Sequence, residues 1–245
     1  MPASGPDLPG LPGLVARAHA LVARVAAAGG GRAVLGVVGA PGAGKSTLVE
    51  TLLAALAASP PTGQGPGWVA HLPMDGYHLA DAQLDRLGRR ERKGAPDTFD
   101  ARGYAATLRR CRTEREHTVF VPGFERTLEQ PLAAALAVLP EAALVVTEGN
   151  YLLLGAAGAA GAAGDGGDPA HQEQGWGEVA AAIDETWYVE VPDAVRRERL
   201  VARHVRFGKT PADAAAWVDT VDEPNARLVA TGRALADLVV DPDGL

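Results

Sequence analysis

The sequence predicts an α/β protein built on a doubly wound parallel sheet. Short apolar runs rich in β-branched residues alternate along the chain with segments of helical periodicity, which is typical of parallel strands joined by helices. The predicted strands are residues 33–38, 68–74, 119–121, 144–147, 186–191 and 238–240. In sheets of this class ligands bind at the carboxyl ends of the strands, so polar residues at those ends are candidates for function.

Helices are expected between these strands. Residues 14–28 carry apolar side chains at helical spacing, and residues 47–58 contain strong helix formers without Gly or Pro. Thr210 and Pro211 mark a helix start, because Thr is a good N-cap and Pro suits the first helical position. Two further helices are expected over residues 101–115 and from Asp193 onward. Residues 76–100 contain turns but have no clear period.

Composition limits the classes of function. The 245 residues suffice for one α/β domain, and the formal net charge of -7 provides no electrostatic footprint for nucleic acid or an anionic membrane. We therefore expect neither nucleic acid nor membrane as a partner. The single cysteine, Cys111, excludes an internal disulfide and is interpreted as a core residue in a reducing compartment.

The predicted domain organisation is simple. Residues 1–13 are broken by Pro and Gly and are expected to be a disordered lead-in rather than a signal peptide. Residues 14–245 form one domain, with a flexible Gly/Ala-rich insertion at 155–175. No apolar run approaches the ~18 residues that a membrane span needs, so a cytoplasmic location is expected. The sequence predicts no oligomeric state.

A glycine-rich loop follows the first predicted strand. Its residues are Gly39, Ala40, Pro41, Gly42, Ala43, Gly44, Lys45 and Ser46, followed by Thr47. They match G-x-x-x-x-G-K-[ST], the P-loop whose backbone N–H groups hold nucleotide phosphates. Lys45 is expected to reach the β- and γ-phosphates, and the Ser46 hydroxyl to bind Mg²⁺. The alternative is a glycine turn in another α/β protein, but the order strand, loop, helix favours binding of ATP with Mg²⁺.

Two carboxylates follow predicted strands. Asp75 comes after residues 68–74, where it can accept the proton of an acceptor hydroxyl or hold a water bound to Mg²⁺. Its alternative role is to cap a turn before Gly76. Glu148 closes the next apolar run in the manner of a Walker B carboxylate and is a candidate Mg²⁺ ligand. The alternative for Glu148 is a solvated strand end.

Arginines recur on the basic helix after Pro192 at spacings of three or four residues. They are Arg196, Arg199, Arg203 and Arg206. Because these spacings place side chains on one face of a helix and Arg binds phosphate in a bidentate manner, residues 193–209 are interpreted as a lid over the triphosphate. Arg199 and Arg203 are the preferred catalytic residues. An ordinary solvated basic face is the alternative.

These motifs together resemble the P-loop small-molecule kinases of the uridine kinase, phosphoribulokinase and pantothenate kinase group, and most of all the nucleoside/nucleotide kinase-like proteins labelled fructose-transport-system kinases. The resemblance rests on residues 39–47, 75–78, 93–100, 147–151 and 196–209. It implies that Asp75 is the catalytic Asp and that Arg199 and Arg203 lie in the lid. It further implies an acceptor pocket lined by Tyr77, His78, Lys93, Phe99, Asp100 and Arg126.

The leading hypothesis is an ATP-dependent kinase whose acceptor is a small hydroxylated metabolite. A sugar, a nucleoside and a pantothenate-like alcohol all fit the pattern. A nucleotide-dependent switch or ATPase is one alternative, although the chain has no Asn-Lys-x-Asp guanine signature. A non-catalytic nucleotide sensor that acts on a protein partner is the other.

Overall fold

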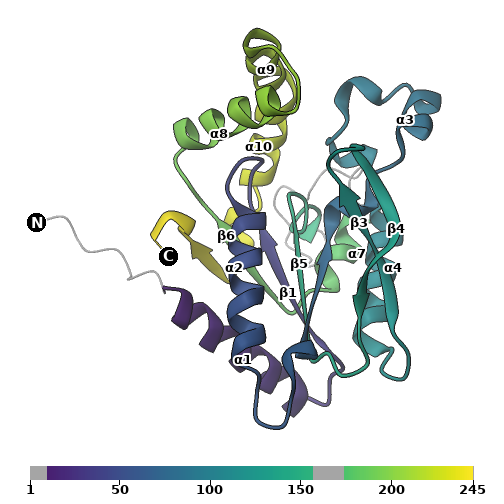
Figure 1. Ribbon diagram of the computed structural model, residues 1–245, viewed down its shortest axis with the longest axis vertical. Helices are drawn as coiled ribbons and strands as arrows, with labels where there is room; N and C mark the ends of the chain where they lie inside the picture. The colour runs from purple at the N-terminus through teal and green to yellow at the C-terminus, as the bar shows by residue number, and fades with distance from the viewer. Residues whose placement is uncertain (1–9, 157–173, 245) are drawn as a thin grey trace, which may run out of the picture.

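The computed structural model describes residues 10–156 and 174–244. At its centre lies a five-stranded parallel sheet in the order β2–β5–β1–β6–β7 (Figure 1). These strands are β1 Ala33–Val38, β2 Val69–Pro73, β5 Leu144–Gly149, β6 Glu185–Val189 and β7 Leu238–Val240. The parallel sheet that the sequence predicts is therefore confirmed.

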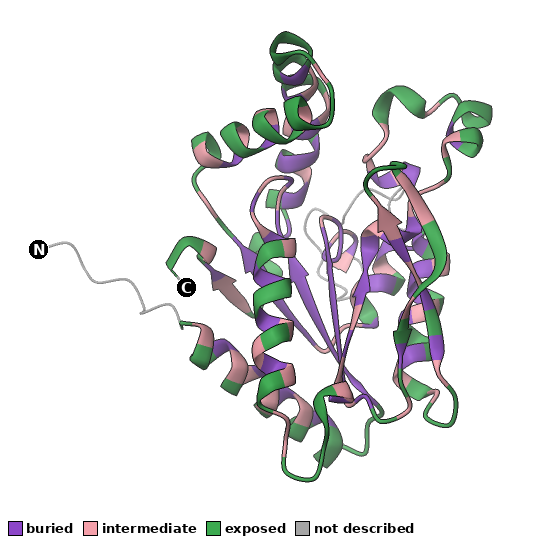
Figure 2. Ribbon diagram, viewed as in Figure 1, coloured by how far each residue is buried: buried purple, intermediate pink, exposed green. Residues whose placement is uncertain are grey.

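Helices cover both faces of this sheet. α1 Leu11–Ala27 and α2 Lys45–Ala58 pack on one face, whereas α4 Ala101–Thr113 and α7 Trp176–Ala181 lie on the other (Figure 1). Successive β1 side chains point to opposite faces, so Leu35 joins one hydrophobic core and Val34 the other. The central strands are accordingly almost entirely buried in Figure 2. The doubly wound architecture is confirmed.

The first helix begins earlier than predicted. α1 starts at Leu11 with Pro12 in its first turn, where the missing N–H of Pro is harmless. Residues 11–13 of the predicted disordered lead-in are thus helical, and residues 1–9 lie outside the described part of the chain. Most of the predicted insertion, residues 157–173, also lies outside it.

A β-ribbon flanks the sheet next to β2 (Figure 1). It pairs β3 Val119–Glu125 antiparallel with β4 Gln130–Val138, a strand that the sequence did not predict. Val121 pairs with Leu136 and Gly123 with Leu132, so residues 133–135 bulge from β4. Within the bulge Ala134 has φ 56, a left-handed conformation that is unfavourable for a side chain with a Cβ.

Two projections rise above the carboxyl ends of the strands (Figure 1). One is helical and consists of α8 Asp193–Arg206, α9 Pro211–Trp217, the π-helical turn η5 Val218–Asp222 and α10 Glu223–Ala230. The other carries α3 Asp81–Leu87 and the tip of the ribbon. Thr210 caps α9 as predicted by accepting a hydrogen bond from the Asp213 N–H. Among the described residues no helix has the length and apolarity that crossing a bilayer requires.

A buried guanidinium fastens the amino end of the sheet. Arg32, directly before β1, donates hydrogen bonds only to backbone carbonyls among its described partners. The acceptors are Ala142 at 2.8 Å, Cys111 at 2.6 Å, Leu139 at 2.7 Å and Pro140 at 3.1 Å, together with Glu114. Burial lowers the pKa of this side chain from its usual value. The loops that meet below the sheet are thus joined by one side chain.

Candidate active site

The glycine-rich loop has the conformation that its sequence requires. Gly42 and Gly44 have φ 80 and 92, values that favour glycine, and Gly44 leads directly into α2. Gly39 lies so close to β6 that a Cβ there would sit 2.6 Å from the Val189 carbonyl oxygen. The loop between β1 and α2 therefore presents the N-terminus of a 14-residue helix at the carboxyl end of the sheet.

Lys45 is buried at the start of α2. Its ammonium donates to the Ala40 carbonyl at 3.1 Å and to Asn150 Oδ1 at 2.7 Å. Burial lowers the pKa of Lys45, and the negative charges of Glu148 and Asp75 oppose this shift. Asn150, just beyond β5, was not assigned a role from the sequence, although its position after a strand end is a usable signal.

Glu148 and Ser46 lie together beside the loop. β5 places Glu148 level with Val37 of β1 and Pro73 of β2, next to the last residue of the strand and thus at its carboxyl end, as the sequence predicted. Ser46 Oγ donates to Glu148 Oε1 at 3.4 Å. Burial raises the pKa of Glu148, and the nearby Asp75 carboxylate raises it further. The Glu148 carboxylate and the Ser46 hydroxyl are hard oxygen donors, so these two residues fit Mg²⁺.

Asp75 sits in the 3₁₀ turn Met74–Tyr77 that follows β2. One carboxylate oxygen lies 3.8 Å from the Arg126 guanidinium, and the side chain is 31% exposed. The backbone carbonyl of Asp75 accepts the His78 N–H at 3.2 Å and lies 2.8 Å from His78 Nδ1. The turn therefore holds both Asp75 and His78 at the carboxyl end of β2.

One cavity of about 500 Å³ connects these groups. Its floor contains Pro41, Gly42, Lys45, Ser46, Asp75, Glu148 and Asn150. Six cationic and five anionic side chains line it, which makes the cavity positive by one charge in a chain of net charge -7. The remaining predicted loop residues, Gly39, Ala40, Ala43, Gly44 and Thr47, shape the loop without lining this cavity.

An aromatic and cationic wall lies on the ribbon side of the cavity. It includes the predicted residues His78, Lys93, Phe99 and Arg126, together with Phe124, which the sequence did not assign. The His78 ring packs 4.0 Å from Phe99 and 4.9 Å from Phe124, and burial lowers its pKa. The Lys93 ammonium lies 5.7 Å from the centre of the Phe124 ring and pairs with Asp81 at 2.7 Å. This wall suits a small molecule with apolar and polar parts.

Two residues predicted for the acceptor pocket, Tyr77 and Asp100, do not line the cavity. Tyr77 points into the core, where its ring packs 4.8 Å from Tyr104 and burial raises its pKa to about 12. Asp100 caps α4 by accepting the Gly103 N–H at 2.8 Å. Both side chains serve the local fold, and a motif match does not reveal the direction in which a side chain points.

The four arginines of α8 separate into different environments. Arg203, one of the two arginines preferred from the sequence, lines the cavity. Arg199 lies outside the cavity lining and pairs with Asp243 at 2.7 Å, although a Cβ on Gly44 would be 3.6 Å from its guanidinium. Arg196 is buried behind the loop. The helical projection also contributes His204, Phe207 and Lys209, which lie within the predicted lid without having been singled out. The sequence missed the other lining residues of the projection, namely Trp217, Val221, Asp222 and Asn225.

The chain is similar to known proteins over much of its length. The chain is 33% identical over 210 residues to "Uncharacterized protein YggC" of Escherichia coli K12, which spans 86% of this chain and 78% of that protein. It is 35% identical over 150 residues to "ATP-dependent kinase-like protein notR'" of Aspergillus versicolor, over 58% of this chain and 77% of the relative. A solved structure of a "putative fructose transport system kinase" from Silicibacter sp. TM1040 matches with a TM-score of 0.74 and 33% identity, covering 93% of this chain and 98% of the other.

Part of the chain also matches a GTPase family. The profile described as "Methylmalonyl Co-A mutase-associated GTPase MeaB" matches residues 11–63. This stretch holds α1, β1, the glycine-rich loop and nearly all of the connection to β2, and it ends before Asp75. The match therefore concerns the nucleotide-binding elements alone.

The fold and the site define a P-loop nucleotide-binding protein with carboxylates at the carboxyl ends of its neighbouring strands. The share of the chain that these relatives cover, and their sequence identity to it, identify the family within this class. The chain belongs to the P-loop kinases of the uridine kinase and phosphoribulokinase group. Its relatives include proteins named as ATP-dependent kinases.

Proposed function

We propose that this protein transfers the γ-phosphoryl group of ATP to a hydroxyl of a small metabolite, such as a sugar, a nucleoside or a pantothenate-like alcohol. The observation that carries the proposal is that the P-loop and Asp75 line the same cavity, with the aromatic and cationic wall beyond Asp75. A phosphate donor bound to the loop would thus face an acceptor held against that wall.

The loop, residues 39–47, is assigned to the phosphates of ATP. Lys45 would exchange its bond to the Ala40 carbonyl for the β- and γ-phosphates, and Ser46 and Glu148 would hold Mg²⁺. The metal supplies positive charge that favours transfer of the phosphoryl group. Such transfer depends on positioning and charge neutralisation more than on covalent chemistry by the protein.

Asp75 is assigned as the general base. The acceptor oxygen would attack the γ-phosphorus while its proton passes to the Asp75 carboxylate, and the bond to the bridging oxygen of ADP would break. Arg126, 3.8 Å from Asp75, would provide a counter-charge at the acceptor. His78, Lys93 and Phe99 would contact the rest of the acceptor molecule.

Residues 193–209 are assigned as a lid. Arg203 faces the cavity, so closure of α8 would bring its guanidinium toward the transferred phosphoryl group. Arg199, beside Gly44, would act nearer the start of α2. Its pairing with Asp243 makes it the less direct candidate for the reacting phosphate.

The decisive test is ADP release in the presence of ATP, Mg²⁺ and a panel of sugars, nucleosides and pantothenate, with Lys45→Ala as the blank. The wild-type protein is expected to respond to one class of acceptor. Asp75→Asn should bind ATP with unchanged affinity and lose turnover by about 100-fold or more. Near-native turnover in that variant would remove Asp75 from the base role.

A nucleotide-dependent switch is the second candidate, because the GTPase profile matches residues 11–63. That candidate predicts hydrolysis without an acceptor, stimulated by a protein partner. A binding comparison of ATP and GTP, followed by the same panel, separates the two. Preference for GTP with no response to any acceptor would favour the switch.

A further inference from the structure

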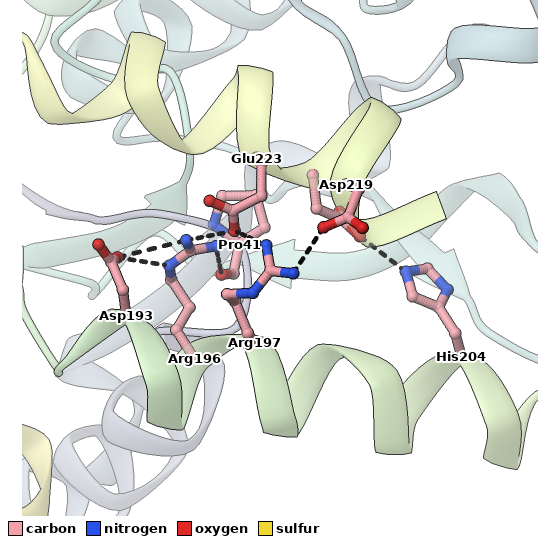
Figure 3. A network of polar contacts seen from close by, with 8 residues as sticks. Pro41, Asp193, Arg196, Arg197, His204, Asp219 and Glu223 are labelled. Carbon is pink, nitrogen blue, oxygen red and sulfur yellow. Dashed lines mark hydrogen bonds and ion pairs between the residues drawn. The ribbon is translucent and has the colours of Figure 1, made fainter. Parts of the chain in front are cut away.

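Arg196 is a buried charge that does not face the cavity. Its side chain is 3% exposed, and its guanidinium pairs with Glu223 at 2.5 Å and with Asp193 at 3.3 Å (Figure 3). The same guanidinium donates to the Pro41 carbonyl of the P-loop at 3.5 Å. Since a charge without partners is costly to bury, the partners of Arg196 reveal what it holds in place. They come from α8, α10 and the P-loop.

The loop and α8 are in direct contact at this point. A Cβ on Gly42 would lie 2.7 Å from the Arg196 carbonyl oxygen and 2.8 Å from Leu200 Cγ. Pro41 and Gly42 line the large cavity on one side of the loop. Arg196 lies on the opposite side, in the wall of a separate cavity of about 220 Å³. Arg196 therefore supports the loop from behind.

The contact at Pro41 determines the direction of one N–H group. In a trans peptide the carbonyl of one residue and the N–H of the next point in opposite directions, and the described chain has no cis peptide bonds. If Arg196 holds the Pro41 carbonyl behind the loop, the Gly42 N–H is turned toward the large cavity. Inward N–H groups are what a P-loop offers to phosphates.

A second cation holds the neighbouring carbonyl from the other side. Lys45 donates to Ala40 and lines the large cavity, so its ammonium can leave the carbonyl when a phosphate arrives. Arg196 does not line that cavity, and its side chain is 3% exposed. Its bond to Pro41 is therefore suited to persist in the nucleotide-bound state.

We propose that Arg196 is a positioning residue for the phosphate site. It keeps the Gly42 N–H directed at the nucleotide and joins the loop to α10 through Glu223. This inference rests on the nucleotide-binding part of the proposed function and is independent of the acceptor. In Figure 3, Arg197 joins α8 to η5 through Asp219, whereas Arg196 reaches Pro41. His204 also joins α8 to η5, by its contact with Asp222 at 2.8 Å.

The neighbouring residue provides a matched control. Arg197 lies on the same helix and contacts Glu223 at 3.4 Å and Asp219 at 2.5 Å, but its interactions do not include the P-loop. Arg196→Met and Arg197→Met therefore each remove a partner of Glu223, and Arg196→Met alone releases the Pro41 carbonyl. Arg196→Lys restores the charge without the fork of donors and should rescue binding partly.

The experiment measures the Kd of Mg²⁺-ADP and of Mg²⁺-pyrophosphate by calorimetry, alongside the thermal unfolding of each variant. Arg196→Met is expected to weaken both ligands by about tenfold, because fewer molecules hold the loop in the binding conformation. Arg197→Met should bind both within about twofold of wild type. Equal weakening for pyrophosphate places the defect at the phosphates rather than at the base.

Two results would overturn the proposal. One is a folded Arg196→Met protein that binds Mg²⁺-ADP as wild type does, and the other is an equal loss in Arg197→Met. If Arg196→Met does not fold, the same Kd values are measured for Arg196→Lys and Glu223→Gln instead. Wild-type affinity in Arg196→Lys would then count against the proposal. If wild-type protein itself binds no nucleotide, the proposed function fails instead.

Discussion

Two buried cations bracket β1, and they are satisfied in different ways. Arg32, before the strand, donates to carbonyls of Ala142, Cys111, Glu114, Leu139 and Pro140. Lys45, after the loop, has two acceptors in range among the described residues, Ala40 and Asn150. Burial lowers the pKa of both side chains. At the amino end of the sheet the donors of Arg32 are thus satisfied by the protein itself, whereas at the carboxyl end Lys45 can still donate a hydrogen bond to a ligand.

The difference separates stability from function. A buried donor that is fully paired within the protein contributes to the native state, and its loss leaves acceptors unsatisfied. A buried ammonium with spare capacity, beside the Glu148 and Asp75 carboxylates, is arranged for a phosphate and a metal. The two ends of the sheet should therefore respond to substitution in opposite ways.

The largest effect is expected from Arg32→Met. The variant leaves several buried carbonyls without donors, so its free energy of unfolding should fall by roughly 3–5 kcal/mol. Urea unfolding measures this loss, and the folded fraction should bind Mg²⁺-ADP normally. Lys45→Met is the counterpart, with nucleotide affinity lost and a smaller fall in the free energy of unfolding, because Lys45 has fewer protein acceptors to leave unsatisfied than Arg32 has. A comparable loss of stability in both variants would contradict the proposed difference between the two ends of the sheet.

The next effect is a pH dependence of metal use. Burial and Asp75 raise the pKa of Glu148, so its carboxylate is lost to protonation at a higher pH than an ordinary Glu with a pKa of about 4.3. Below the raised pKa the apparent Mg²⁺ affinity should fall by roughly tenfold per pH unit. Because the folded state binds this proton more tightly than the unfolded chain, stability without metal should decrease as pH rises through the same window. Mg²⁺ titration and thermal unfolding across pH measure both trends.

Glu148→Gln is the control for this prediction. It removes the titrating group, so both pH trends should flatten while the Ser46 contact can persist through the amide oxygen. An unchanged pH profile in the variant would assign the titration to another residue.

The smallest effect lies outside both ends of the sheet, in the β4 bulge. Ala134→Gly removes a left-handed strain and should raise the free energy of unfolding by about 0.5 kcal/mol after the larger backbone entropy of unfolded Gly is subtracted. Ala133→Gly, a neighbour without positive φ, should instead destabilise by roughly 0.5–1 kcal/mol. Neither change should alter nucleotide affinity. Thermal unfolding measures the pair, and equal shifts would show that φ is irrelevant here.

The sequence predicted the sheet well because its strands are buried on both faces and read as apolar runs. β4 escaped prediction for the opposite reason. Its residues, QPLAAALAV, lack alternation, contain Pro131 and include helix formers, so pairing with β3 overrides local preference. α3 was missed in residues 76–100 because its seven residues are too few to show a helical period.

The site could be predicted where a sequence motif fixes the backbone conformation. It was less predictable where the direction of a side chain determines whether a residue lines the cavity. The glycine pattern predicted the loop, and strand ends located Asp75 and Glu148. Tyr77 and Asp100 share a motif with His78 and Phe99, yet the chain turns them toward the core and the α4 cap. His204 lies within the predicted lid, but its partner Asp222 comes from η5, whose packing against α8 is a tertiary property that no local pattern reveals.

The strand order also affects when the nucleotide site can form. β1 pairs on one side with β5, where Val37 meets Glu148, and on the other with β6, where Leu35 meets Glu185. β2, the next strand along the chain, pairs with β5 instead of β1. The glycine-rich loop thus lies near the start of the chain, whereas the strands that pair with β1 and hold the loop in place come from much later segments. Such long-range closure is slow, so the phosphate site is expected to be among the last parts of the chain to become ordered during folding or synthesis.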